Sequence, residues 1–207
     1  MMLTCGGLRL QEHAPDDRAD VADFIQRRFR ETYGATLTHL MPRLFSLSNS
    51  ASEMIAAFGL RDAARERLFM EKYLDRAVET VLSRHHGAIV PRSTIVEVGN
   101  LATSAGGARA VIVALTHYLH AHGIEWITFT GVAALRSAFA RLGLRPVVLA
   151  AADPARLSAT ELMSWGSYFS ANPVVMGGYV PGGHAALVAA GAPAPAGMLA
   201  RCGALVA

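Results

Sequence analysis

The feature that most constrains the fold is a block of alternating element types in the middle of the chain. Residues 93–99 form a run rich in β-branched side chains, residues 102–107 form a loop with two glycines, and residues 124–130 form a second β-rich run. Between the loop and the second run, apolar side chains recur three or four positions apart until Gly123, which predicts a helix. One face of this expected helix carries Val111, Ile112, Leu115, Tyr118, Leu119 and His122. A strand–helix–strand unit predicts a parallel strand pair and an α/β protein.

Further strands and helices are predicted on both sides of this block. The strands are expected at residues 8–11 (at a sheet edge), 44–47, 54–60 and 146–150. The helices are expected from Asp16 to Gly34, over residues 63–83, and in a short segment that ends at Gly143. Together these signals predict a mixed sheet, antiparallel in its early part and partly parallel at its centre, with helices on both faces.

Composition limits the classes of function. The chain has 207 residues, of which 52% are hydrophobic and 17% charged, which favours one folded domain over a disordered chain. No run of about 18 apolar residues and no secretory signal is found, so we expect a cytoplasmic protein that does not span a membrane. The net charge of +3 comes from scattered arginines without interleaved aromatics, so no nucleic-acid partner is expected. Cys5 and Cys202 lie near opposite ends and lack metal-ligand spacing.

The composition changes near residue 180, which divides the chain into a domain at residues 1–180 and a tail at residues 181–207. The tail consists almost wholly of Ala, Gly, Pro, Val and Leu. Two interpretations stay open at this stage. The tail is either low-complexity and loosely docked, or a hydrophobic segment that covers an apolar groove or meets a partner.

Several short motifs resemble the thermostable hemolysin family over roughly residues 20–180. They are Leu68–Asp75, Ile95–Ala102, Phe129-Thr130, Arg141–Leu144 and Trp165–Tyr168, and the run from Glu97 to Ala102 is the most specific of them. That family is similar to the acyl-homoserine-lactone synthases within the GNAT superfamily of N-acetyltransferases. The predicted order of elements is also that of the superfamily.

The resemblance implies a GNAT-like fold whose central strands, residues 95–99 and 126–129, splay apart to admit the pantetheine arm of acyl-CoA or of an acyl carrier protein. Backbone groups near Asn100, Leu101 and Ala102 would bind that arm and polarise the thioester carbonyl. The phosphate loop of the superfamily matches residues 103–108, where Gly106, Gly107 and Ala108 precede a helix N-terminus. Thr103 replaces the usual basic or amide residue, and Arg109 would supply the missing charge. The alternative is that the glycines of this loop serve only to form a tight turn and bind no phosphate.

Glu97 is the candidate general base, because a carboxylate among the apolar residues of a strand needs a task or a partner. Two other interpretations stay open: Glu97 faces solvent, or it pairs with Arg92. Phe139 stands where many members of the superfamily carry a proton-donating tyrosine, so no general acid is expected there. A thiol with a pKa of roughly 8.5 departs without strong help.

Other candidate residues concern the acceptor and the acyl chain. Arg61, Glu71 and Arg92 suit the carboxylate and ammonium groups of an amino acid, and each also suits an ordinary ion pair. Trp165, Tyr168 and Phe169 line an acyl channel or pack in the core. His117 and His120 share a helix face without a carboxylate, so no metal site is expected.

The sequence therefore predicts an N-acyltransferase that moves an acyl group from acyl-CoA or an acyl carrier protein to a small, amino-acid-like amine by direct attack, without a metal. The alternatives are a membrane-damaging protein, which the name of the family suggests, and a non-catalytic binder of acyl thioesters. The oligomeric state is left open.

Overall fold

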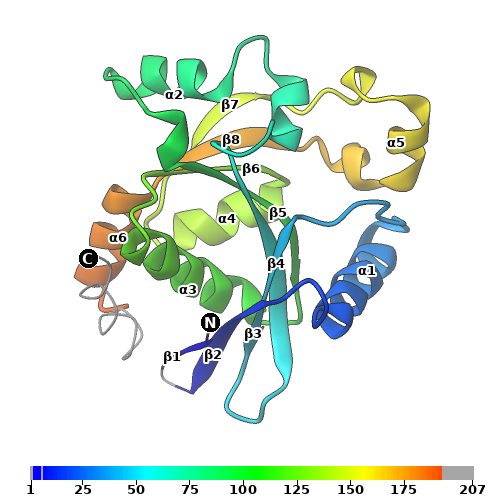
Figure 1. Ribbon diagram of the computed structural model, residues 1–207, viewed down its shortest axis with the longest axis vertical. Helices are drawn as coiled ribbons and strands as arrows, with labels where there is room; N and C mark the ends of the chain where they lie inside the picture. The colour runs from blue at the N-terminus through cyan, green and yellow to red at the C-terminus, as the bar shows by residue number, and fades with distance from the viewer. Residues whose placement is uncertain (1, 6, 193–207) are drawn as a thin grey trace.

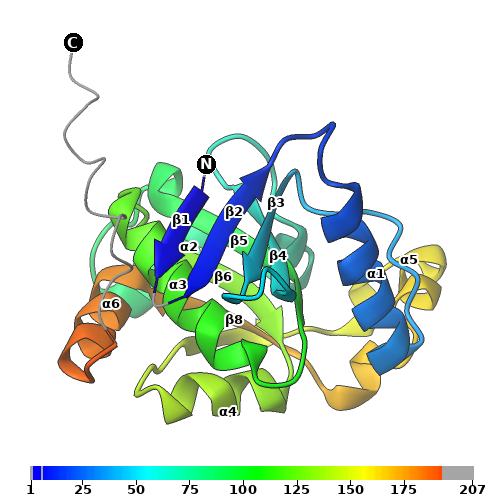
Figure 2. The same ribbon diagram turned by 90° about the horizontal axis from the view of Figure 1, so that it is seen from below.

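The computed structural model describes residues 2–5 and 7–192, which build one sheet with helices on both of its faces (Figures 1 and 2). The sheet has eight strands in the order β1-β2-β3-β4-β5-β6-β8-β7. The strands are β1 (Met2–Cys5), β2 (Leu8–His13), β3 (Arg43–Ser48), β4 (Met54–Asp62), β5 (Ile95–Thr103), β6 (Trp126–Gly131), β7 (Val147–Ala151) and β8 (Val174–Tyr179). The α-helices are α1 (Ala19–Tyr33), α2 (Val78–His86), α3 (Gly107–Ala121), α4 (Ala133–Arg141), α5 (Ala159–Ser164) and α6 (Val180–Ala189). Four 3₁₀ helices are η1 (Phe69–Tyr73), η2 (Arg92–Thr94), η3 (Pro154–Arg156) and η4 (Tyr168–Ala171).

The strand directions confirm the predicted mixed sheet. Strands β1 to β5 pair antiparallel in chain order, β5 and β6 pair parallel, and β6, β8 and β7 are again antiparallel. Helices α3 and α4 pack on one face with Phe58, Val98 and Phe129. Helix α1 covers part of the other face, and α2 with η1 covers the rest. This second face carries Glu97.

Helix α1 follows its amphipathic sequence. Val21, Phe24, Ile25 and Phe29 are buried on one side of the helix. Gly34 then adopts the left-handed conformation (φ 64°), and its N–H bonds the carbonyl oxygens of the last turn, which ends the helix as predicted.

The single helix predicted over residues 63–83 is wrong. This segment forms η1 and α2 instead, because carboxylates bind the backbone N–H groups at the start of each of them. Glu71 accepts from Leu68 and Val78, and Glu97 accepts from Phe69 and Met70. Because of these contacts, two short helices form where the local pattern of apolar residues predicts one long helix.

Two features of the sheet were not predicted. The expected edge strand β2 is covered by β1, which pairs along it. Strand β8 inserts between β6 and β7, and its two glycines hide its strand character in the sequence. A Cβ on Gly177 would lie 2.7 Å from Leu82 Cδ2, so this glycine lets α2 approach the sheet.

Helix α6 shows that the described part of the predicted tail is packed. Leu187 is fully buried against α3, and the carbonyl oxygen of Ala192 lies 2.9 Å from His117 Nε2. Residues 181–192 therefore fit the second interpretation of the tail, in which a hydrophobic segment covers apolar side chains. The rest of the predicted tail, residues 193–207, lies outside the described residues. Within the described chain, no helix combines the length and apolarity that a membrane crossing needs.

The packing of α6 predicts unequal effects of truncating two adjacent side chains. Leu187→Ala should lower the free energy of unfolding by about 2–5 kcal/mol, because it leaves a cavity between α6 and α3. Val188→Ala, at a half-exposed position on the same helix, should change it by less than about 0.5 kcal/mol. Urea unfolding measures both values, and equal effects would contradict the docked helix.

Candidate active site

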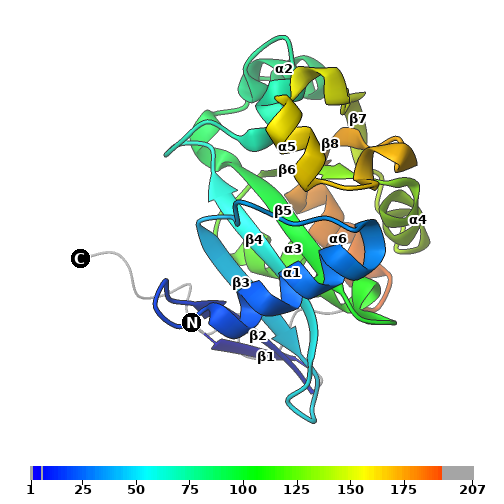
Figure 3. The same cartoon turned by 90° about the vertical axis from the view of Figure 1, so that its right-hand side faces the viewer.

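The central strands β5 and β6 pair over only part of their length. Their register joins Ile95 to Trp126, Val96 to Ile127 and Glu97 to Thr128. Beyond this last pair, β5 continues to Thr103 against β4 alone, and β6 continues to Gly131 against β8 alone (Figure 3). The predicted splay of the central strands is confirmed. Backbone groups on the two facing edges are thereby free to bind another extended chain.

Strand β5 carries a bulge beside this opening. Ala57 faces Ala102 and Gly59 faces Gly99, so β5 uses one residue more than β4 between the two pairs. Asn100, inside the bulge, has a left-handed backbone (φ 53°), which is uncommon for a residue with a side chain. Its Oδ1 accepts a hydrogen bond of 2.7 Å from the N–H of Met41. The bulge thus places irregular backbone at Asn100 and Leu101, where the resemblance implied the thioester arm.

Glu97 is buried on the face of α1 and η1, with 3% of its surface exposed. Its Oε2 accepts from the N–H of Phe69 at 2.7 Å, and its Oε1 accepts from the N–H of Met70 at 2.9 Å. Burial raises the pKa of this carboxyl to about 7, although the two amides and the nearby Arg61 lower it. Glu97 therefore neither faces solvent nor pairs with Arg92. Its carboxyl group changes charge near neutral pH, as a general base must.

Arg61 lies next to Glu97 on the same face. The two residues are direct cross-strand neighbours on β4 and β5, and Thr128 continues the row on β6. The Nε of Arg61 is buried without a hydrogen-bond partner among the described residues, and it lies 3.4 Å from Glu66 Oε2. A buried donor of this kind is costly unless it binds something. Arg61, Glu97 and Thr128 thus form a polar row at the point where β5 and β6 separate.

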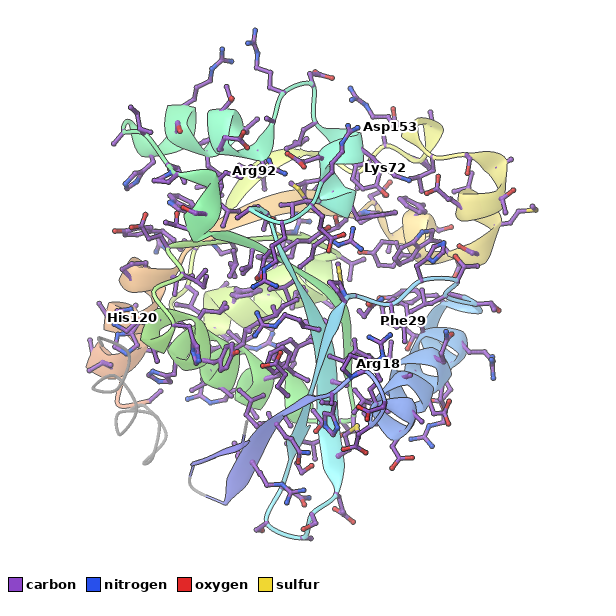
Figure 4. The ribbon with its side chains drawn as sticks, viewed as in Figure 1. Arg18, Phe29, Lys72, Arg92, His120 and Asp153 are labelled. Atoms are coloured by element: carbon purple, nitrogen blue, oxygen red, sulfur yellow. The ribbon has the colours of Figure 1, made fainter. Side chains whose placement is uncertain are left out.

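Glu71 and Arg92, the other predicted acceptor residues, bind each other. The guanidinium group of Arg92 contacts both oxygens of Glu71, at 2.7 and 2.9 Å, and it also contacts Glu79 at 2.6 Å (Figure 4). Burial tends to raise the pKa of Glu71, but Arg92 and the N–H groups of Val78 and Leu68 hold it down at about 2. This pair joins η1 to α2 and η2.

The loop before α3 has the geometry of an anion site. Gly106 is left-handed (φ 81°) and precedes the first turn of α3. The N–H of Gly107 donates to the carbonyl oxygen of Ser104 at 3.1 Å, and the next N–H groups of this turn lack helical partners. A Cβ on Gly107 would lie 2.4 Å from the carbonyl oxygen of Ile55, so this glycine also serves packing. Arg109 is exposed in the first turn. Arg28 of α1, which the sequence did not single out, donates from its Nε to the carbonyl oxygen of Thr103 at 2.9 Å.

Aromatic side chains from three segments gather on the face of Glu97. Trp165 packs against Phe29 of α1 and Phe69 of η1, with ring centroids 6.2 and 6.0 Å apart. Tyr168 packs against Tyr33 at 5.1 Å, and its hydroxyl donates to the carbonyl oxygen of Thr130. Lys72 of η1 pairs with Glu161 of α5 and joins the same segments (Figure 4). Trp165, Tyr168 and Phe169 therefore belong to an apolar wall between α1 and η1.

Phe139 lies buried in α4, and its ring stacks on Phe129 with centroids 5.1 Å apart. It has no proton to donate. Within the described residues, His, Cys, Asp and Glu side chains form no group of three or more suited to a metal ion. His117 contacts Ala192, and His120 stacks on His184.

A model of the thermostable hemolysin family matches residues 11–184. The chain belongs to this family. The match includes β5, the bulge, the loop before α3 and the aromatic wall, so the site described above lies within the part that defines the family. No curated protein sequence matches the chain closely enough to count as a relative.

Solved structures share the fold at low sequence identity. FeeM, an N-acyl amino acid synthase from uncultured soil microbes, has a TM-score of 0.56 at 14% identity, and the match covers 89% of this chain and 97% of that one. MesI, a CoA-dependent acyl-homoserine lactone synthase, has a TM-score of 0.50 at 14% identity, with coverage of 91% and 97%. A structure described as an N-acetyltransferase from Lactobacillus plantarum has a TM-score of 0.50 at 13% identity, with coverage of 84% and 99%. The chain has the GNAT-like fold that the resemblance implied.

The buried Glu97 predicts how stability depends on pH. Its pKa rises from 4.5 to about 7 on folding, so the folded chain holds this proton more tightly than the unfolded chain. The resulting stabilisation is complete below pH 4.5 and is lost as the pH rises through 7. Between pH 5 and 8, the free energy of unfolding of Glu97→Gln should therefore fall less steeply than that of the wild type.

Urea unfolding at each pH measures these slopes. Glu125→Gln, at an exposed position just before β6, is the matched control and should keep the wild-type slope. Equal slopes in all three proteins would show that Glu97 titrates at its ordinary pKa.

Proposed function

We propose that this chain is an N-acyltransferase that moves an acyl group from an acyl thioester to the amine of a small, amino-acid-like acceptor. The observation that carries the proposal is the separation of β5 and β6 immediately after Glu97 and Thr128, beside the bulge at Asn100. FeeM and MesI, which share the fold, are acyl-transferring synthases. The buried carboxylate and the freed backbone lie within one site, as acyl transfer requires.

The donor is a thioester of CoA or of an acyl carrier protein. Its extended pantetheine arm would lie in the opening and bond the free N–H and C=O groups along β5, as an added strand does. A thioester carbonyl near the bulge would accept from the backbone of Asn100 or Leu101, which stabilises the developing oxyanion. The phosphate groups would meet the first turn of α3, with Arg109 and Arg28 as the nearby cations. The CoA-dependence of MesI supports this class of donor.

Transfer proceeds by direct attack. The acceptor nitrogen forms a bond to the thioester carbon, the carbon–sulfur bond breaks, and the sulfur leaves as a thiolate that takes a proton from solvent. Glu97 takes the proton of the attacking amine, directly or through water, because each of its oxygens keeps a lone pair beyond the amide bond that it accepts. Phe139 supplies no proton to the sulfur, and a thiol leaving group with a pKa of roughly 8.5 tolerates this loss.

The acceptor carries a carboxylate. Arg61 stands beside Glu97, and its buried Nε makes no hydrogen bond within the described part of the chain, although it lies 3.4 Å from Glu66 Oε2. A guanidinium group is suited to carboxylate recognition, and an acceptor bound there places its amine toward Glu97 on the neighbouring strand. An α-amino acid has both groups at the required separation of two bonds.

The proposal is tested with purified protein, acyl-CoA or an acylated carrier protein, and amino acids. Thiol release and the N-acyl product, measured by absorbance and mass spectrometry, should both require the acceptor. Initial rates should indicate a ternary complex. Ping-pong kinetics with a trapped acyl-enzyme would contradict direct attack. Lysis of liposomes by the protein without any thioester would instead favour a membrane-damaging function.

Replacing Glu97 should slow the reaction and change its pH dependence. In Glu97→Gln we expect kcat/KM to fall by about 10²–10⁴-fold, because the amide cannot take a proton. The wild-type kcat/KM should rise as the pH passes 7, since Glu97 acts only when it is ionised and its pKa is about 7. The part of the rise with its midpoint near pH 7 should vanish in the variant and leave only the rise at higher pH from deprotonation of the acceptor amine, while Glu125→Gln should keep the part near pH 7. A variant that folds and retains the midpoint near pH 7 would exclude Glu97 as the base.

Replacing Arg61 should weaken acceptor binding selectively. In Arg61→Ala the KM for the amino acid should rise about 10- to 100-fold, since a hydrogen bond to a charged group is lost. The KM for the thioester should stay unchanged. Arg65→Ala is the matched control, because the Arg65 side chain is 83% exposed. An equal rise in both KM values would indicate a structural role for Arg61.

A further inference from the structure

Two glycines face each other across β4 and β5 on the face that carries Glu97. Gly59 and Gly99 are a cross-strand pair, and each lies two residues along its strand from the pair of Arg61 and Glu97. Successive residues of a strand point to opposite faces of the sheet, so residues two apart point to the same face and the two pairs lie on the same side. Because neither glycine has a side chain, the Gly59–Gly99 pair leaves a notch in the sheet surface directly beside the polar row.

The side chain of Met41 fills this notch. A Cβ on Gly59 would lie 2.2 Å from Met41 Cβ, and a Cβ on Gly99 would lie 2.1 Å from Met41 Cε. The methionine thus runs from β4 to β5, and its terminal methyl group lies over Gly99, beyond the last β5–β6 pair. Its backbone is held by Asn100, whose Oδ1 accepts from the Met41 N–H. Met41 is 8% exposed.

The opposite side of the polar row is closed by fixed structure. Leu68 and Met70 are buried there with Ala63 and Ile95. The N–H of Met70 is bonded to Glu97 itself, so this segment cannot move away without breaking a bond to the base. With the thioester arm in the opening between β5 and β6, an acceptor held at Arg61 and Glu97 would direct its side chain away from this closed segment, toward the notch and Met41.

We propose that Met41 determines the size of the acceptor, because its side chain occupies the part of the site that the acceptor side chain would enter. This inference rests on the proposed function and adds the class of substrate, small α-amino acids such as glycine and alanine. Leu44 Cδ2 also lies over Gly59, 3.1 Å from a Cβ placed there, whereas the three nearest atoms to a Cβ on Gly99 all belong to the unbranched Met41 side chain. Removal of this side chain therefore opens the space over Gly99. Both glycines must stay for the opening to exist, since a Cβ at either position would fill it.

The test compares acceptors of increasing size in the wild type and in Met41→Ala. The measured quantity is the ratio of kcat/KM for leucine to that for glycine, with one acyl-CoA as donor. We expect this ratio to rise at least about 10-fold in Met41→Ala, because a pocket distinguishes substrates that differ by a few carbon atoms by a factor of that size. Met41→Leu keeps the volume but lacks the reach over Gly99, and it should give a smaller rise in the same direction. It also provides a second variant should the alanine variant fold poorly.

Met54→Ala is the matched control, since Met54 packs on the same α1 cluster at the distant start of β4. Its selectivity ratio should equal that of the wild type. An unchanged ratio in folded Met41→Ala and Met41→Leu, with active wild type, overturns the role of Met41 and leaves the proposed function standing. A wild type that transfers no acyl group to any amino acid overturns both proposals.

Discussion

The carboxylate of Glu97 is the contact on which the arrangement of the site depends. It stands on the central strand β5 and accepts the N–H groups of Phe69 and Met70, so it fixes where η1 begins and how η1 lies over the sheet. A carboxylate at the start of a helical turn is favourable, yet its burial is costly, and the balance leaves its pKa near neutrality. One group thereby holds a structural element in place and remains able to exchange a proton.

The opening between β5 and β6 and the bulge at Asn100 act together. Loss of pairing frees one edge of β5, and the extra residue in β5 turns its backbone away from a regular strand. The segment before β3 crosses this region, and the bond from the Met41 N–H to Asn100 holds it there. The face with Arg61 and Glu97 is thus bounded by η1 on one side and by Met41 on the other. The aromatic wall of Trp165 and Tyr168 lies between α1 and η1.

Much of the fold could be predicted because local signals coincide with burial. Each of these signals predicts the element in which it lies. They are the apolar stripe of α1, the glycines that follow α1 and α3, and the β-branched run of β5. The helix predicted over residues 63–83 failed because two carboxylates divide it: Glu71, which accepts from the N–H groups of Leu68 and Val78, and Glu97, which is 28 residues away from Phe69. Glu97 and Arg61 were singled out from residue type and context, and the structure places them side by side on β5 and β4, while their roles stay predictions. Three further contacts depend on how segments far apart in the sequence pack together, for which the sequence carries no local signal. They are the Glu71–Arg92 pair, the bond from Arg28 to Thr103 and the position of Met41 over the two glycines.

The phenylalanine at position 139 bears on the acyl donor that the proposed transfer can use. Its ring, stacked on Phe129, has no proton to give to a departing atom. The proposed mechanism therefore favours a leaving group that is stable as an anion near neutral pH. Sulfur meets this condition, whereas the alkoxide released from an ordinary oxygen ester is far more basic, so we expect the proposed transfer to discriminate against oxygen esters as acyl donors.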